Sequence, residues 1–212
     1  MSSSERIVFD ADNHMYEAPE VVTDYLPKRY ARDIQFVEVK GRTKIAIKGH
    51  ISNYMPNPTF DRVAAPGSHV PYYAGTNTEG KSLRELTGEP IECRAEFRDP
   101  AARLARFDEQ GINRSLMFPT LANLMEYSLE GDPELTHAAV HAVNEYVHDT
   151  WSFDYEQRIL SVPVITLPIV EKAVEELEWV LERGARAILV RPGPVTGHSG
   201  SRSIGLPEFD PF

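Results

Sequence analysis

From Asp99 onward, short apolar runs alternate with segments that carry helical signals, and this alternation restricts the chain to the α/β class. The helical segments open on Asp-Pro or close on Gly, as helix ends commonly do. They are long enough to cross over between parallel strands. We therefore expect helices that start near Asp99, Asp132 and Pro168, and parallel strands near residues 7–10, 114–118, 159–165 and 186–190.

Four parallel strands fit two architectures. An open doubly wound sheet carries helices on both faces, whereas a TIM-type (β/α)₈ barrel carries them on its outer face only. The run Ile7–Phe9 is continuously apolar, which is typical of a strand buried on both faces. One apolar stripe is expected on the helix that starts near Asp132, formed by Leu135, Ala139, Ala142 and Tyr146.

Between the first strand and Asp99 the sequence is irregular. A hairpin is expected where apolar and polar residues alternate on either side of "KGRT". Residues 52–92 are rich in Pro, Gly and Asn without periodicity, and so long a loop in a compact domain is usually functional or disordered. We expect residues 32–92 to form a hairpin and a lid-like insertion within one domain that spans residues 1–212.

Charge and hydropathy exclude several kinds of partner. The formal net charge is −10 and no block of Lys and Arg stands out, so we expect no nucleic-acid partner. The most apolar stretch, "VPVITLPIV", is far too short to cross a bilayer, and the N-terminus has no apolar signal core. We therefore expect no membrane partner and a cytoplasmic location. Cys93 is the single cysteine, which excludes an internal disulfide and a thiolate metal cluster.

Three carboxylates and a histidine follow the first strand, namely Asp10, Asp12, His14 and Glu17. Catalytic groups of parallel α/β folds gather where the strands end. Residues two apart on an extended segment point the same way, so Asp12 and His14 present an oxygen and a nitrogen to one point. Zinc, manganese and iron(II) accept such ligands, with Glu17 as a further candidate. The alternative is that Asp10 or Asp12 caps the turn and His14 is an ordinary polar residue.

Other candidate residues are an arginine at a strand end and several histidines. Arg191 follows the fourth strand, where its guanidinium either clamps a substrate carboxylate or forms an ion pair at the rim. His198 is interpreted as a loop histidine. His137, His141 and His148 are expected on a solvated face of their helix together with Asn144, opposite the apolar stripe.

Three segments resemble the amidohydrolase-related family, in the branch that includes aminocarboxymuconate-semialdehyde decarboxylase and γ-resorcylate decarboxylase. "FDADNHMYE" resembles the family's first strand. "DPAARLARFDEQGINRSLMFPT" is similar to its second segment, where a Pro-led helix feeds a strand that ends in Phe-Pro-Thr. "GLPEFDPF" is similar to the approach to the helix before strand five. The resemblance implies a (β/α)₈ barrel, of which this chain holds about the first four β/α units after a long insertion.

The resemblance also implies a divalent metal ion at the strand ends, zinc first and manganese or iron as alternatives. The family's first-strand pattern is D-x-H-x-H, and its two histidines bind the metal. Asp10 matches the leading Asp and His14 the second His, whereas Asp12 replaces the first His. A carboxylate is still a competent ligand, and γ-resorcylate-type decarboxylases carry Glu there.

The function that the resemblance implies is a metal-dependent hydrolase acting on a small, carboxylate-bearing substrate. A metal-dependent decarboxylase of the same family is the alternative. An alternative from another functional class is that the chain is a catalytically inactive remnant or a half-barrel interaction module. The family takes a further His after strand five and an Asp after strand eight, regions that are absent from this chain. We therefore expect the 212-residue chain alone to be inactive, and to form a homo-oligomer.

Overall fold

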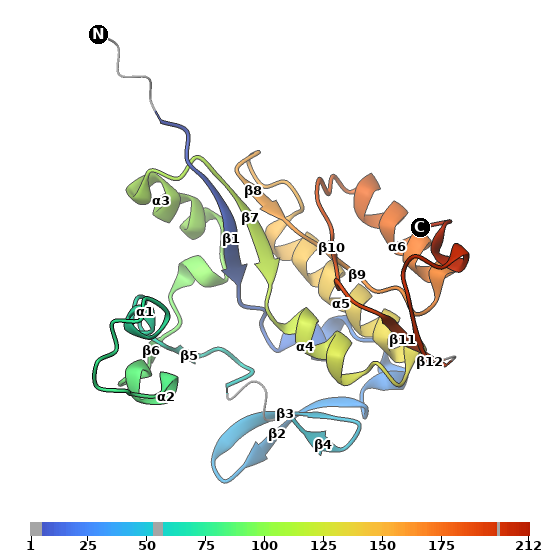
Figure 1. The fold of residues 1–212 in the computed structure, drawn as a ribbon, viewed down its shortest axis with the longest axis horizontal. Coiled ribbons are helices and arrows are strands. Elements are labelled where there is room, and N and C mark those ends of the chain that lie inside the picture. The colour runs from blue at the N-terminus through green and yellow to red at the C-terminus, as the bar shows by residue number, and fades with distance from the viewer. Residues whose placement is uncertain (1–5, 53–56, 199) are drawn as a thin grey trace.

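The computed structural model describes residues 6–52, 57–198 and 200–212, and shows an open, mixed α/β fold built on parallel strands (Figure 1). One sheet has the order β1-β7-β8, and β9 pairs in parallel with β10. The four predicted strands are confirmed as parallel neighbours, but the described residues do not close a barrel. Their bounds are Phe9–Met15 for β1, Arg114–Pro119 for β7, Ile159–Ser161 for β8, Val164–Ile165 for β9 and Leu189–Val190 for β10.

The third predicted strand is interrupted between β8 and β9. Pro163 lies at the interruption and has no amide hydrogen to donate to a ladder. The chain remains bonded on both sides, because Val162 N donates to Met117 O at 2.9 Å and Leu189 N donates to Pro163 O at 2.8 Å. The strands on either side of the break therefore keep one continuous order.

Three long helices match the sequence signals: α3 (Pro100–Gln110), α5 (Pro133–Trp151) and α6 (Val170–Glu182). The Asp99 carboxylate accepts the amide of Ala101 at 2.8 Å, and Asp132 caps α5 in the same way. The apolar stripe of α5 is buried as expected. No helix among the described residues is both long and apolar enough to cross a membrane.

A fourth helix, α4 (Leu121–Ser128), was not predicted. It begins directly after β7 and packs against α5. The C-terminal stretch, expected to be a loop, contains a small hairpin of β11 (Val195–Gly197) and β12 (Gly200–Arg202), followed by a single 3₁₀ turn at Pro207–Phe209.

The two faces of the parallel sheet differ in burial. On β7, Ser115, Met117 and Pro119 are buried, whereas Leu116 and Phe118 on the opposite face stay partly exposed. The expectation that Ile7–Phe9 is buried on both faces is wrong, since Ile7 is 80% and Phe9 49% exposed. The described residues thus cover one face of the sheet with helices and leave the other face open.

The insertion after β1 consists of short elements. The predicted hairpin is present as β2 (Ile34–Val39) and β3 (Arg42–Ile47), whose turn residues Lys40 and Gly41 both have positive φ, as a tight two-residue turn requires. The other elements are two turns of helix at Val21–Tyr25 and Lys28–Tyr30, then β4 (His50–Ile51), β5 (Arg62–Val63), α1 (Val70–Tyr73), α2 (Leu83–Thr87), β6 (Ile91–Glu92) and a 3₁₀ turn at Ala95–Phe97.

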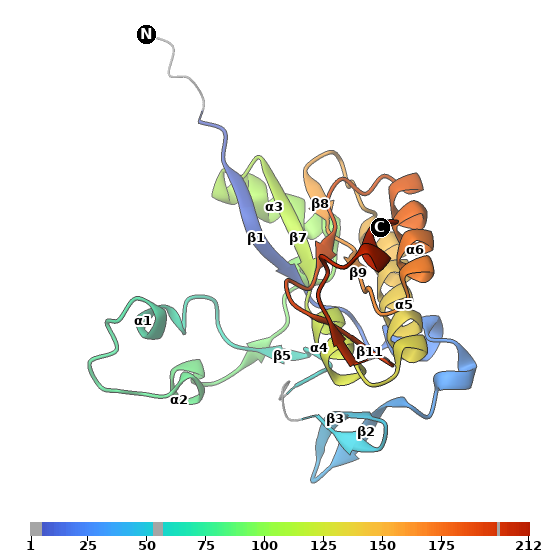
Figure 2. The same cartoon turned by 45° about the vertical axis from the view of Figure 1, so that its right-hand side comes forward.

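An aromatic stack attaches this insertion to the end of β1. The ring of Tyr16 stacks on Phe60 at 4.5 Å and on Phe97 at 4.9 Å between ring centroids. The part that carries α1 and α2 extends away from the parallel strands in both views (Figures 1 and 2). A lid over the strand ends remains a prediction, and residues 53–56 of the expected lid lie outside the described residues.

Candidate metal centre

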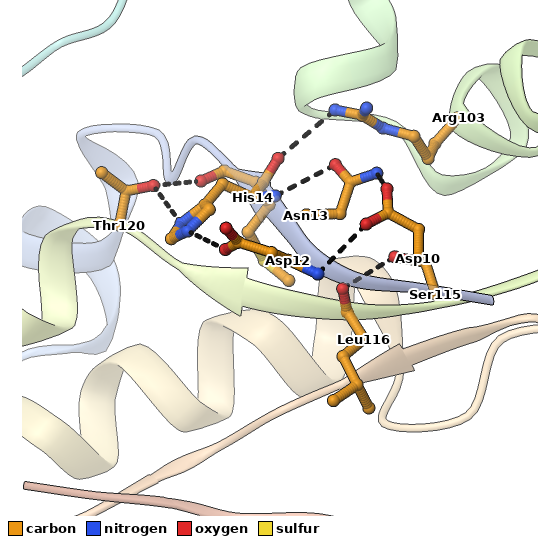
Figure 3. Close-up of polar contacts among 9 residues, drawn as sticks. Asp10, Asp12, Asn13, His14, Arg103, Ser115, Leu116 and Thr120 are labelled. Atoms are coloured by element: carbon orange, nitrogen blue, oxygen red, sulfur yellow. Dashed lines mark hydrogen bonds and ion pairs between the residues drawn. The ribbon is translucent and has the colours of Figure 1, made fainter. Parts of the chain in front are cut away.

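The end of β1 contains a bulge that Asp10 holds in place. Asp10 pairs with Ser115 and Asn13 pairs with Met117, so β1 has one residue more than β7 between these pairs. One carboxylate oxygen of Asp10 accepts the amide of Asp12 at 3.1 Å, and the other accepts Asn13 Nδ2 at 2.9 Å (Figure 3). Asp10 therefore caps this turn, and the side chain of Asp12 does not take part in the cap.

Asp12, within the bulge, and His14, two residues later, point toward each other (Figure 3). Asp12 Oδ1 lies 3.4 Å from His14 Nε2, and their side chains are 89% and 46% exposed. Two ligands held at about 2.0–2.2 Å from a tetrahedral zinc ion stand roughly 3.4 Å apart. The separation and the donor chemistry of this pair therefore fit one shared divalent ion.

The other side of the His14 ring faces Thr120, at the end of β7. Thr120 Oγ1 donates to Met15 O at 2.8 Å and lies 3.5 Å from His14 Nδ1. A hydroxyl that already donates its proton can still accept one from the ring, so Thr120 can pair with the tautomer that carries its hydrogen on Nδ1 and turns the Nε2 lone pair toward Asp12. Arg103 Nη2 donates to His14 O at 3.3 Å and holds the backbone of the same residue.

Glu17 is not brought to this pair. Its side chain is fully buried, and its two oxygens accept the amides of Thr120 at 3.1 Å and Leu121 at 2.8 Å, at the start of α4. Burial raises the pKa of Glu17 to about 7, although the backbone amides oppose the shift. The described residues contain no group of three or more His, Cys, Asp or Glu side chains placed to hold a metal ion. The centre thus offers two protein ligands, fewer than a closed site needs.

Arg191 emerges beyond β10, as predicted, and forms the rim ion pair. Its Nη1 lies 3.2 Å from Glu130 Oε2, and its guanidinium stands 5.8 Å from the centre of the Tyr127 ring. Both partners of the ion pair are 42% exposed. The other guanidinium nitrogens make no hydrogen bond to a described residue, so Arg191 keeps donors for a further anion.

The histidines of α5 and of the last hairpin lie elsewhere. The expected solvated face is wrong for His137 and Asn144, which are buried because α6 and β9 pack on that side. His137 Nε2 accepts the amide of Ile169 at 3.1 Å, and burial lowers the pKa of His137 to about 4. His141 Nδ1 lies 2.6 Å from Glu176 Oε2, which raises the pKa of His141. His198 is exposed in the turn after β11.

Comparison with known proteins adds one strong likeness. No family model matches the chain, and no curated protein matches it. The crystal structure of amidohydrolase map2389c from Mycobacterium avium subsp. paratuberculosis K-10 does match, with a TM-score of 0.90 and 35% sequence identity. The match covers 99% of this chain and 55% of the amidohydrolase. The chain resembles an amidohydrolase.

This likeness supports the amidohydrolase family and leaves the decarboxylase branch unaddressed. The chain spans about half the length of the amidohydrolase that it matches. Amidohydrolases generally use divalent metal ions, which agrees with the donor chemistry of Asp12 and His14 but does not identify the ion. The sequence identifies Thr120 only as a strand-end residue, and neither Arg103 nor Glu126 of α4 has a local pattern that predicts a site.

Proposed function

We propose that this chain forms the first part of a metal-dependent hydrolase of the amidohydrolase-related family, acting on a small, carboxylate-bearing substrate. The observation that carries the proposal is the Asp12–His14 pair, whose ligand atoms stand 3.4 Å apart where β1 ends. Catalytic groups of parallel α/β enzymes gather at that end of the strands. The likeness to an amidohydrolase over 99% of the chain gives independent support.

Each residue around the pair has a part in this proposal. A bound divalent ion lowers the pKa of a water molecule and polarises a carbonyl group. Asp12 and His14 supply two of its ligands, the bulge held by Asp10 aims them, and Thr120 orients the imidazole. Arg191, with guanidinium donors to spare, binds the carboxylate of the substrate.

The fold component of the proposal is a partial (β/α)₈ barrel. The parallel order of the strands and the open face of the sheet support it, as does coverage of 55% of the matched amidohydrolase. The insertion at residues 32–92 is proposed as a lid. Exposed apolar side chains on β1 and just before it, including Ile7 and Phe9, favour association with a second copy, so we also propose a homo-oligomer.

Metal binding tests the proposal directly. We expect zinc or manganese to bind weakly, since two ligands rarely hold an ion firmly. Titration against a chromophoric chelator should show a loss of affinity of more than about tenfold in His14→Ala and in Asp12→Asn. His198→Ala, which removes an exposed histidine outside the pair, is the matched control and should bind as the wild type does. Equal affinity in all four proteins would reduce the pair to a surface ion pair.

Turnover distinguishes the two chemistries. The metal-loaded full-length enzyme, of which this chain is proposed to be the first part, should hydrolyse amides or esters that carry a carboxylate, and the products should be an acid with an amine or an alcohol. The 212-residue chain alone should show little or no turnover. Release of carbon dioxide from the same compounds would instead identify the alternative, a metal-dependent decarboxylase. Metal binding without either reaction would support the inactive remnant or half-barrel module.

A further inference from the structure

A small cavity lies between α4, the end of β9 and the end of β10. Its volume is about 20 Å³, enough for one small polar group rather than for a whole substrate. Aliphatic side chains and prolines form most of its wall, and the polar groups that line it include Glu126, Thr166 and Arg191. Thr166 and Arg191 each follow directly on a strand of the parallel set, so the cavity belongs to the same end of the strands as the Asp12–His14 pair.

The hydroxyl of Thr166 is buried beside the carboxyl group of Glu126 and has room for a better hydrogen-bond partner. Thr166 is only 2% exposed, and its Oγ1 makes no hydrogen bond that satisfies both distance and angle among the described residues. A buried polar group without a well-placed partner destabilises the folded state, so folded proteins usually supply a partner. Because Thr166 lines the cavity, a polar group inside it can supply that partner.

Three charged residues line the cavity. Glu126 belongs to α4, Glu130 lies two residues past the end of that helix, and Arg191 follows β10. β9 and α5 contribute the uncharged Thr166 and Thr136. Burial raises the pKa of Glu126, and the nearby Thr166 hydroxyl and Arg191 guanidinium lower it in part.

The position of α4 relates this cavity to the proposed metal centre. Thr120, which faces His14, is the N-cap residue of α4, and Glu126 lies six residues further along the chain. At 1.5 Å per residue, this corresponds to roughly 9 Å along the helix axis.

We propose that this cavity binds one carboxylate of the substrate, with Arg191 as its cationic partner and with Thr166 and the carboxyl group of Glu126 as hydrogen-bond donors. That the ligand is the substrate rests on the proposed function, whereas the anion site stands on the cavity itself. Two carboxylates in contact resist being ionised together, so the incoming anion binds with a proton on Glu126. Glu126 and Thr166 are then specificity-determining residues that select an anion and couple its binding to proton uptake.

Acetate is the probe for this site, titrated into the protein in EDTA and followed by NMR chemical shifts. The apparent affinity should fall as the pH rises, approaching tenfold per pH unit once Glu126 is ionised, because one proton accompanies each anion. In Glu126→Gln the side-chain amide still donates a hydrogen bond but does not titrate, so the affinity for acetate should not change with pH. Acetamide, the neutral isostere, should bind more weakly than acetate in the wild type at low pH.

Three further variants define the donors. Thr166→Val and Arg191→Met should weaken acetate several-fold or more, whereas Thr166→Ser retains the hydroxyl and should restore binding. Arg186→Met removes an arginine that pairs with Asp154 away from the cavity, and should change nothing. Loss of binding in Arg186→Met to the same degree, an unchanged pH profile in Glu126→Gln, or no acetate binding at all would each overturn the proposal.

A metal-centre variant separates this proposal from the proposed function. His14→Ala should bind acetate as the wild type does, because the titration contains no metal. Normal acetate binding together with absent metal binding would therefore defeat the hydrolase and leave the anion site standing. Normal metal binding without acetate binding would instead defeat the anion site and leave the proposed hydrolase standing.

Discussion

Asp12 and Glu17 lie five residues apart on one segment, yet their carboxylates have opposite surroundings. The side chain of Asp12 is 89% exposed and faces His14, whereas Glu17 is fully buried and accepts two backbone amides at the start of α4. A carboxylate committed to orphan amides stabilises a helix end. One with free oxygens remains available to a ligand. The comparison teaches that position near a strand end does not by itself make a carboxylate a metal ligand.

The largest effect expected from this comparison is on stability. Glu17→Ala leaves the amides of Thr120 and Leu121 without an acceptor inside the protein and should lower the free energy of unfolding by about 2–4 kcal/mol near pH 5. Asp12→Ala removes an exposed side chain and should change it by less than about 0.5 kcal/mol. Urea unfolding of the two variants beside the wild type measures both. Similar losses of unfolding free energy in the two variants would show that Glu17 stabilises the fold no more than Asp12 does.

The next effect is on pH dependence, since burial raises the pKa of Glu17 to about 7 from an ordinary value of 4.5. Between these values the folded protein binds more protons than the unfolded chain, so stability falls as the pH rises through this window. The shift corresponds to about 3 kcal/mol. Other groups titrate in the same range. The quantity to compare is therefore the slope of the unfolding free energy against pH in the wild type minus the same slope in Glu17→Gln. A difference near zero would show that the Glu17 pKa is not raised.

The same contacts explain why the sequence predicted α3, α5 and α6 but not α4. The first two open on Asp-Pro, and the third is followed by Gly184, all local signals. The start of α4 has no side-chain cap of its own, because the acceptor for its first amides comes from Glu17, 103 residues earlier. Rules that look for a cap next to the helix have nothing to find there.

Burial of polar side chains was the second feature that local patterns could not predict. Asn144 was expected in solvent, but its side chain pairs with the backbone of Val164, accepting from N at 3.0 Å and donating to O at 2.8 Å. The side-chain amide of Asn144 thus makes the two hydrogen bonds that a neighbouring strand would otherwise make to Val164. Helical periodicity identifies the apolar stripe of α5, yet whether the opposite face meets water or β9 depends on tertiary packing. By contrast, the sequence predicted that Asp12 and His14 converge on one point, and their side chains do face each other within β1, where the bulge held by Asp10 shapes the strand.

The smallest expected effect concerns Thr120, which connects the two carboxylates that the comparison sets apart. Its amide donates to Glu17 at 3.1 Å, while its hydroxyl lies 3.5 Å from His14 Nδ1. Thr120→Val keeps the amide and the shape but removes the hydroxyl, so the Glu17 contact survives and the imidazole loses its orienting partner. Zinc affinity should fall about tenfold, as for other partners that orient a metal-binding histidine. Stability should fall by only about 1 kcal/mol, from the lost hydrogen bond to Met15 O.

Thr120→Ser retains the hydroxyl and is the matched control, with zinc affinity expected within about twofold of the wild type. Chelator competition and urea unfolding on the same preparations separate the two roles. If Thr120→Val lost stability but bound zinc as the wild type does, the hydroxyl would serve only the Met15 carbonyl, and Thr120 would belong with Glu17 on the structural side of the comparison. A tenfold loss of zinc affinity in Thr120→Val, beside the expected stability loss of about 1 kcal/mol, would instead place Thr120 with Asp12 and His14 as a residue that orients a metal ligand.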